Sequence, residues 1–194
     1  MNPLLAQKRL LRAELRQRRN ALPASERLAA SKKIREGLLG LPELSSATWV
    51  FCFISSGDEV GTHRLIDALV ERGKQVLVPW IPAGGDMVAV HFPGWDGLAP
   101  GQLGILTPVA PRPHEGRVDL CITPGLGFTI RGERIGYGRG YYDRWFASHE
   151  TGCRLGIAFE CQIVDRVPVN ETDVVLDILL TEARLIVTGA LGGG

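Results

Sequence analysis

The sequence predicts an α/β protein with a mostly parallel sheet and helices on both faces. Residues 48–55 (T-W-V-F-C-F-I-S) form a nearly continuous apolar run, which is typical of a strand buried on both faces. Apolar strand segments then alternate with segments of helical period, and this order builds parallel sheets. The 194 residues fit one domain with a substantial core. We therefore expect a three-layer domain over residues 1–188 and a disordered tail at 189–194.

Four helices are expected from apolar residues with helical spacing and from residues that favour helix ends. Ser25 is a candidate cap for the second helix and Thr62 for the third, because a side-chain hydroxyl can accept a hydrogen bond from a free backbone N–H. Gly40 and Gly73 follow the ends of the same two helices. The expected helices are residues 3–20, 25–39, 62–72 and 141–149.

The remaining regular segments are short and apolar, as expected of strands. Residues 93–117 are rich in proline and glycine and are expected to form an irregular connection within the same domain. The expected strands are residues 48–55, 75–78, 87–92, 118–122, 154–159, 174–180 and 184–187.

The composition disfavours several classes of protein. A formal net charge of +1 gives no overall attraction to nucleic acid or to an anionic membrane. No apolar run approaches ~20 residues, and the N-terminus lacks the apolar core of a signal peptide. Cys52, Cys121, Cys153 and Cys161 form no C-x-x-C pair, which favours reduced, buried thiols over disulfides or zinc ligands. We therefore expect a cytoplasmic monomer without a nucleic-acid or membrane partner.

A glycine-rich stretch, residues 124–144 (P-G-L-G-F-T-I-R-G-E-R-I-G-Y-G-R-G-Y-Y-D-R), follows the expected strand at 118–122. Gly136, Gly138 and Gly140 leave the backbone free to adopt positive φ and to turn its N–H groups toward an anion. The helix expected after them adds the positive end of its dipole. This stretch is therefore a candidate phosphate-binding loop.

Charged side chains extend the expected chemistry of this stretch. Arg134, Arg139 and Arg144 supply mobile positive charge, and Asp143 supplies a hard oxygen ligand. The combination suits a nucleotide phosphate with a divalent cation. However, the spacing G-x-G-x-G matches neither the Walker A loop nor the G-x-G-x-x-G fingerprint. From the residues alone, phosphate binding and a purely structural glycine turn are equally open.

The first expected helix carries a lysine among its core-facing leucines. At ~100° per residue, Leu4, Leu11 and Leu15 share one face. Lys8 falls inside that stripe, and Arg12 lies at its edge. Burial of an unpaired ammonium is unfavourable, so Lys8 should have an anionic partner, which a nucleotide phosphate could be. The residues alone slightly favour the alternative, in which the lysine stem passes the leucines and its ammonium reaches solvent.

The compound motif of P-G-L-G-F-T and R-I-G-Y-G-R-G-Y-Y-D-R resembles the signature of the 5-formyltetrahydrofolate cyclo-ligases, also called 5,10-methenyltetrahydrofolate synthetases. The likeness covers nearly the whole chain. It implies the fold shared with ribose-phosphate isomerase and CoA-transferase-like proteins. It also implies ATP-dependent closure of 5-formyltetrahydrofolate to 5,10-methenyltetrahydrofolate, with release of ADP and phosphate. Tyr137 departs from the pattern, because some members carry arginine or another residue there.

The resemblance implies a nucleotide site shared by the first helix and the glycine-rich stretch. Lys8 and Arg12 match a K-x-x-x-R pair that helps to bind ATP in the family. Lys8, Arg139 and Tyr141 are the expected catalytic residues. The residues implied for ATP are Lys8, Arg9, Leu10, Leu11, Arg12, Arg134, Ile135, Gly136, Tyr137, Gly138, Arg139, Gly140, Tyr141 and Tyr142.

The resemblance also implies a folate site in the loop S-G-D-E-V-G-T, where open α/β sheets bind ligands. Glu59 matches the substrate-binding glutamate of the family, and Ile54 matches an apolar substrate contact. A carboxylate can accept two hydrogen bonds from the amino-pyrimidine edge of a pterin. Tyr137 and Tyr141 are the other expected folate contacts. Without the resemblance, the acids of this loop are expected to be solvated.

Magnesium is the metal that the resemblance implies, with ATP as co-substrate. Asp143 and Asp177 match the aspartates expected near this ion. For Asp177, the residues alone leave a polar position at a strand end as an equal alternative.

Two rival functions remain open at this stage. A sugar-phosphate isomerase or an acyl-CoA enzyme of the same fold would also bind an anion, but would not turn over ATP. The second rival takes K-R-L-L-R-A-E-L-R-Q-R-R as a nucleic-acid-binding helix. Such binding would weaken steeply with salt, which cyclo-ligase activity would not do.

Overall fold

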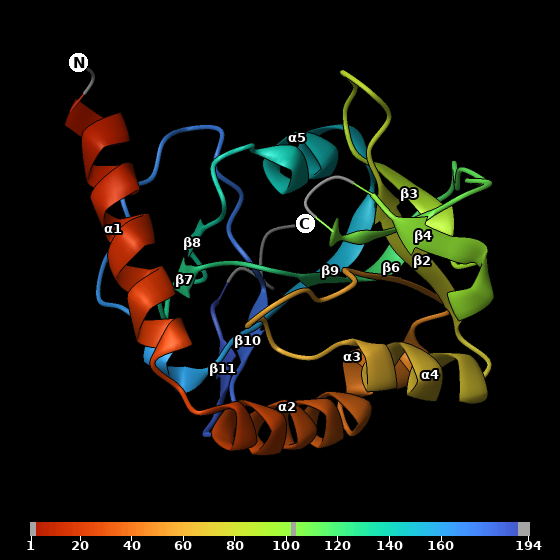
Figure 1. Ribbon diagram of the computed structural model, residues 1–194, viewed down its shortest axis with the longest axis horizontal. Coiled ribbons are helices and arrows are strands. Elements are labelled where there is room, and N and C mark those ends of the chain that lie inside the picture. Colours follow the sequence, from red (N-terminus) through yellow and green to blue (C-terminus); the bar gives the residue numbers. More distant parts are fainter. Residues whose placement is uncertain (1–2, 102–103, 190–194) are drawn as a thin grey trace.

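A computed structural model describes residues 3–101 and 104–189 of the chain. Five parallel strands form the centre of a seven-stranded sheet of order β11-β10-β9-β6-β1-β2-β3, and β3 and β11 add antiparallel edges. The prediction of a mostly parallel sheet is therefore confirmed (Figure 1). The strands of this sheet are β1 (Trp49–Cys52), β2 (Gln75–Trp80), β3 (Val88–His91), β6 (Val118–Thr123), β9 (Thr151–Ile157), β10 (Ile178–Leu180) and β11 (Leu185–Val187).

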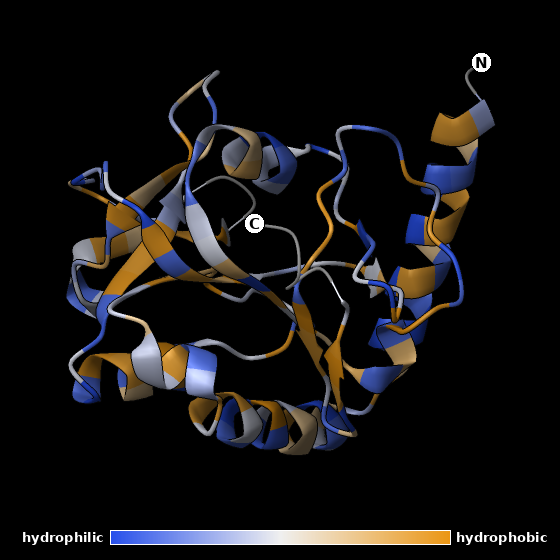
Figure 2. Cartoon of the chain, turned by 180° about the vertical axis from the view of Figure 1, so that it is seen from behind, coloured by the Kyte–Doolittle hydropathy of each residue, from blue (hydrophilic) through white to orange (hydrophobic). Residues whose placement is uncertain are grey.

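Helices cover both faces of the sheet, because successive strand residues point to opposite sides. Val50 and Cys52 face a core that includes residues of α2, α3 and α4, whereas Phe51 faces Trp145 of α5. Figure 2 shows the hydrophobic colouring of the inner strands between these layers, and the mixed colouring of the amphipathic α1. The helices are α1 (Pro3–Asn20), α2 (Ala24–Leu39), α3 (Pro42–Ser46), α4 (His63–Glu71) and α5 (Tyr141–Ser148).

The expected helix caps differ from the observed ones. Ser25 lies inside α2, which begins at Ala24 without a side-chain cap, so its prediction as a cap is wrong. Thr62 does precede α4, but its hydroxyl donates to Phe53 O at 2.7 Å and accepts the N–H of Ser55 at 2.8 Å. This threonine therefore braces the loop that leaves β1 and does not cap the helix.

Several short elements have no counterpart among the predictions. The irregular connection contains the 3-10 helix η1 (Trp95–Gly97) and a hairpin of β4 (Leu98–Pro100) with β5 (Leu106–Pro108). Another small hairpin, of β7 (Gly127–Phe128) with β8 (Arg134–Ile135), lies within the glycine-rich stretch. The short α3 and the 3-10 helix η3 (Glu160–Gln162) are the others.

The hairpin of β7 and β8 brings α1 beside the glycine-rich stretch. Leu15 of α1 packs with Leu126, Ile135 and Val167 in one buried cluster. A side chain at Gly127 would place its Cβ 2.4 Å from the Cδ1 of Leu15, so only glycine permits this close approach. The first helix is thereby fixed next to the loop that leads into α5.

The four cysteines are free thiols, and Cys52, Cys121 and Cys153 are buried as predicted. Burial raises the pKa of Cys121 and that of Cys153 to about 12, which keeps both thiols protonated and unreactive. None of the helices within the described residues combines the length and apolar character of a membrane span. Of the expected tail at 189–194, residues 190–194 lie outside the described part of the chain.

Candidate active site

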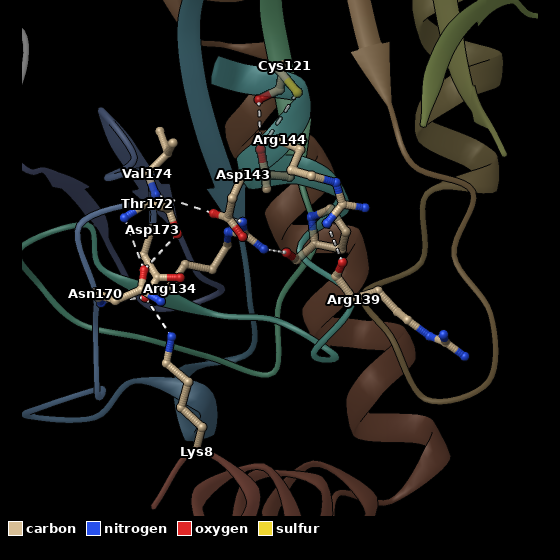
Figure 3. Close-up of polar contacts among 12 residues, drawn as sticks. Lys8, Cys121, Arg134, Arg139, Asp143, Arg144, Asn170, Thr172, Asp173 and Val174 are labelled. Carbon is tan, nitrogen blue, oxygen red and sulfur yellow. Dashed lines mark hydrogen bonds and ion pairs between the residues drawn. The ribbon is translucent and has the colours of Figure 1, made fainter. Parts of the chain in front are cut away.

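Three segments that are far apart in sequence meet beside the loop at residues 136–140 (Figure 3). They are α1, the start of α5 and the turn at residues 170–174. Lys8 is only 8% exposed, and its Nζ lies 2.6 Å from Oδ2 of Asp173. Asp173 also accepts the N–H of Asn170 at 2.8 Å. The predicted anionic partner of Lys8 is thus present, and it is a carboxylate of the same chain.

Arg134 and Asp143 form a second ion pair in this cluster. Nη2 of Arg134 lies 2.8 Å from Oδ1 of Asp143, and the Arg134 side chain is 5% exposed. The same Oδ1 accepts the N–H of Val174 at 3.3 Å. Nε of Arg134 is buried and has no hydrogen-bond partner among the described residues. Arg134 therefore retains a donor that an incoming anion could use.

The glycine loop adopts a conformation that other residues rarely reach. Gly138 has φ 101° and Gly140 has φ 65°, and a Cβ at Gly138 would lie 3.2 Å from Cζ of Arg12. Nε of Arg12 donates to the carbonyl of Gly136 at 2.8 Å. Burial lowers the pKa of Arg12, and the like charge of Arg16 lowers it further. An anion beside the loop would relieve this repulsion.

The eight-residue helix α5 begins directly after this loop. Its N-terminus has no side-chain cap, so its first N–H groups are available to a ligand. Arg139 is exposed and no partner of its guanidinium is found in the described part of the chain; Figure 3 shows it extending away from Asp143. Arg144 instead ties the loop down, since it donates to the carbonyl of Arg139 at 2.8 Å and to Asp86 at 2.7 Å.

The two tyrosines at the start of α5 have different surroundings. Cζ of Arg144 lies 5.3 Å from the ring centroid of the half-buried Tyr141. Tyr142 turns inward, where its ring stacks on Phe51 and lies 5.7 Å from Cζ of Arg134. Its hydroxyl is buried without a hydrogen-bond partner among the described residues, and burial raises its pKa.

The residues expected for ATP are not all brought to the loop. Arg12 contacts it and Lys8 contacts the turn at residues 170–174, whereas Arg9 and Leu10 are exposed. Leu11 and Ile135 belong to the apolar cluster around Leu15, and no contact places them at a polar ligand.

Glu59 lies in the loop after β1 and contacts the glycine loop through Tyr137. The hydroxyl of Tyr137 donates to Oε1 of Glu59, and the N–H of Ser56 donates to Oε2 at 2.9 Å. Burial raises the pKa of Glu59, although the hydrogen bond from Tyr137 opposes that shift. Ile54 is 5% exposed and lies two residues after β1. Of the residues expected for folate, the structure therefore brings Glu59 and Tyr137 into direct contact.

Arg19 is a residue of this region that the motifs did not reveal. It pairs with Asp58 at 2.7 Å, and its Nη1 donates to the Tyr137 hydroxyl at 3.0 Å. Arg19 is one of several arginines near the end of α1, and nothing in the sequence distinguishes it from its exposed neighbours. Asp173 was missed for a similar reason, because only the tertiary structure brings it to Lys8.

The contacts of Asp177 give no support to the expectation that it lies at the metal. Asp177 is 2% exposed, and Nε and Nη2 of Arg154 donate to its two carboxylate oxygens at 3.0 and 2.8 Å. The backbone N–H of Arg154 adds a third hydrogen bond at 2.8 Å. This carboxylate is therefore fully engaged in an ion pair between neighbouring strands.

Asp143 fits a metal better than Asp177 does. Its Oδ2 makes no hydrogen bond within the described residues, and its side chain is 20% exposed. Across the described chain, no group of three or more His, Cys, Asp or Glu is arranged to hold a metal ion. Magnesium is commonly bound by one or two carboxylates together with substrate phosphates and water, so Asp143 suits that kind of site.

The glycine-rich stretch follows β6 and the Glu59 loop follows β1, so both leave the sheet at the carboxyl ends of neighbouring parallel strands. Basic side chains and a glycine loop next to the carboxylates of Asp58 and Glu59 are the arrangement expected of an α/β enzyme that binds an anionic substrate. Comparison with known proteins identifies the family. Residues 5–182 match the 5-formyltetrahydrofolate cyclo-ligase family, and the chain belongs to it.

Individual relatives agree with this assignment. A 5-formyltetrahydrofolate cyclo-ligase of Mus musculus is 30% identical over 192 residues, which cover 90% of this chain and 93% of the relative. A probable 5-formyltetrahydrofolate cyclo-ligase of Caenorhabditis elegans is 34% identical over 150 residues, covering 70% and 73%. The solved structure of Aquifex aeolicus 5,10-methenyltetrahydrofolate synthetase superposes with a TM-score of 0.84 at 27% identity, covering 96% and 95%.

Proposed function

We propose that this protein closes 5-formyltetrahydrofolate to 5,10-methenyltetrahydrofolate with consumption of ATP and release of ADP and phosphate. Family membership supports the reaction. One structural observation carries the proposal: Tyr137 of the cationic glycine loop hydrogen-bonds to Glu59. A nucleotide held by the loop and a folate held by Glu59 would therefore be neighbours.

The chemistry needs ATP because a formyl oxygen is a poor leaving group. The formyl oxygen attacks the γ-phosphorus and ADP departs. N10 of the folate then attacks the activated formyl carbon and loses its proton, and the C–O bond breaks to release phosphate. The protein contributes mainly positioning and charge neutralisation, as in other phosphoryl transfers.

Lys8, Arg12 and Arg134 surround the place where the triphosphate would lie. Phosphate oxygens would replace Asp173 on Lys8 and fill the free Nε of Arg134. Arg139 has a guanidinium free to swing toward the phosphates, which suits a catalytic role beside Lys8. The uncapped N–H groups after Gly140 complete the cradle. The exposed Arg9 and Leu10, and the neighbouring Leu11, have no polar contact that supports them as ligands.

Magnesium would be held by Asp143 and the phosphates. When bound, the ion would neutralise charge that develops on the transferred group. Arg134 fixes the carboxylate of Asp143 through Oδ1 and leaves Oδ2 toward the ion. Asp177 takes no part in this proposal.

Glu59 would hold the amino-pyrimidine edge of the folate. The N–H groups of that edge would donate to the remaining acceptor sites of Oε1 and Oε2, beside the hydrogen bonds from Tyr137 and Ser56. Ile54, Tyr137 and Tyr141 would supply the remaining contacts. Since the bound pterin donates hydrogen bonds, Glu59 must be ionised when it binds.

The rival function of nucleic-acid binding finds little support in α1. Lys8, Arg18 and Arg19 are paired with acids, and Arg12 is bound to the glycine loop. We propose instead a monomeric, one-domain enzyme over residues 1–188. Strands as far apart in the chain as β1 and β11 share one sheet, and residues of α2 pack in its core, which supports this division. The free cysteines support a reducing compartment such as the cytoplasm.

Absorbance of methenyltetrahydrofolate, followed with and without ATP and magnesium, tests the proposal. We expect turnover only when both are present, with one ADP formed for each methenyl product. Full activity in chelator without nucleotide would contradict the ATP-dependent mechanism. An isomerase of the same fold would convert a sugar phosphate without forming ADP.

A further inference from the structure

Arg19 occupies an unusual position for an arginine near the end of a basic helix. It is 4% exposed, whereas its neighbour Arg18 has a side chain that is 46% exposed and pairs with Glu14 on the same helix. Nε and Nη2 of Arg19 donate to both carboxylate oxygens of Asp58, at 2.9 and 2.7 Å. Nη1 donates to the hydroxyl of Tyr137 at 3.0 Å. One guanidinium therefore joins the β1–α4 loop to the glycine loop.

The direction of these hydrogen bonds is fixed by chemistry. Arginine can only donate, so the oxygen of Tyr137 accepts from Arg19. The single hydroxyl proton of Tyr137 is then free to go to Oε1 of Glu59. The other oxygen of Glu59 is held by the N–H of Ser56 at 2.9 Å. Glu59 is thus oriented by a tyrosine that Arg19 itself orients.

We propose that Arg19 is a positioning residue for the folate-binding carboxylate of Glu59, acting through Asp58 and Tyr137 without contacting the substrate. This inference rests on the proposed function of Glu59. Arg19 acts through two routes. It clamps Asp58, the chain neighbour of Glu59, and it aligns the hydroxyl that donates to Glu59. Lys8 and Arg12 of the same helix belong to the proposed nucleotide site. Helix α1 therefore contributes residues to both proposed substrate sites.

The charges around Glu59 predict how the loss of Arg19 would change the pKa of Glu59 and the pH dependence of folate binding. Burial raises the pKa of Glu59, while Tyr137 and Arg19 oppose that shift and Asp58 adds to it. Two further groups bear on this network, since Tyr142 interacts with Glu59 and Arg27 with Asp58. Removal of the Arg19 charge should therefore raise the pKa of Glu59. Folate affinity should then be lost most strongly toward acid pH.

The experiment compares Arg19→Gln with the adjacent control Arg18→Gln. The carboxyl of Glu59 is titrated by 13C NMR in labelled protein, with its resonance assigned by Glu59→Gln. Dissociation constants for 5-formyltetrahydrofolate and for ATP are measured across the same pH range. For Arg19→Gln we expect a Glu59 midpoint at higher pH and a folate affinity lowered about tenfold at neutral pH, with ATP affinity changed less than about threefold. Arg18→Gln should match the parent protein.

Tyr137→Phe provides a second test if Arg19→Gln does not fold. Tyr137 is 41% exposed, and the change removes only the hydroxyl that links Arg19 to Glu59. We expect a Glu59 shift in the same direction and smaller than that of Arg19→Gln. An unchanged Glu59 midpoint in these variants overturns the inference, and so does an equal, pH-independent loss of both ligands. The titration needs no turnover. If the parent protein binds no folate the proposed function fails, whereas the Glu59 midpoints still test the positioning by Arg19.

Discussion

Lys8 and Asp173 are separated by 165 positions in the chain, yet Nζ of the lysine lies 2.6 Å from Oδ2 of the aspartate. Both side chains are largely buried, at 10% and 18% exposure. A buried ammonium needs an anion, and in the absence of nucleotide the protein supplies one from its own turn at residues 170–174. In the proposed function, nucleotide phosphate would have to displace this carboxylate, so we expect Asp173 to compete with ATP for Lys8.

Asp173→Asn tests that competition. The change should lower the free energy of unfolding by about 1–3 kcal/mol, because Lys8 is left buried beside a neutral acceptor. ATP should bind about five- to tenfold more tightly, since no carboxylate opposes it. Thermal unfolding with and without ATP measures both effects. Glu36→Gln, which removes an exposed pair with Lys32, is the matched control and should change neither. Weaker ATP binding in Asp173→Asn would make Asp173 part of the nucleotide site.

Glu59→Gln should damage the folate site selectively. A charged hydrogen bond at such a site contributes ~1.5–3 kcal/mol, so the KM for folate should rise tenfold or more while the KM for ATP changes little. Steady-state kinetics with each substrate varied in turn gives this comparison. Equal increases in both constants would indicate general damage to the fold.

The raised pKa of Glu59 predicts a pH dependence of both binding and stability. Folate needs the carboxylate, so its affinity should fall as pH falls through the raised pKa. For stability the sign is opposite. A carboxyl whose pKa is higher in the folded state contributes stability that is present below its unfolded pKa and is lost as pH rises through the folded value. Glu59→Gln should therefore be no less stable than the parent at neutral pH, as thermal unfolding across pH would show.

Asp143→Asn should reveal whether this carboxylate holds magnesium. The turnover rate should fall ~100-fold or more, because a metal ligand supplies several kcal/mol of transition-state stabilisation. A high magnesium concentration should restore part of the lost turnover rate. The free energy of unfolding without ligands should fall by about 1–3 kcal/mol, as for Asp173→Asn, because Arg134 is left buried beside a neutral acceptor. The rate measured against magnesium concentration distinguishes these roles, with the exposed Glu150→Gln as control. Superimposable curves for Asp143→Asn and parent would remove Asp143 from the metal site.

Asp177→Asn should lower stability without changing how the turnover rate depends on magnesium. Breaking a partly buried pair with Arg154 should lower stability by about 1–3 kcal/mol. The magnesium dependence of the rate should match that of the parent, because both carboxylate oxygens of Asp177 accept hydrogen bonds from Arg154. A magnesium requirement that rises tenfold in this variant would return Asp177 to the metal site.

The regular elements could be predicted because their causes are local. Apolar residues at helical spacing marked α1, including the burial of Leu15, and the run at 48–55 marked the buried β1. The glycine loop was also visible, since Gly138 and Gly140 occupy backbone conformations that other residues avoid. The small hairpin of β7 and β8 was not visible, because two-residue strands carry no period to detect.

By itself the sequence determined the mostly parallel α/β fold, the glycine loop and the cyclo-ligase resemblance, and it left the partner of Lys8 open between an anion and solvent. Only the tertiary structure decided that Lys8 pairs with Asp173, that Asp177 pairs with Arg154, and that Arg19 reaches Glu59 through Tyr137. The physical reason is the range of the forces involved. Periodicity and backbone preference act over a few residues of the chain. The choice of a charge partner depends on which side chains folding brings within a hydrogen bond of one another, however distant they are in sequence.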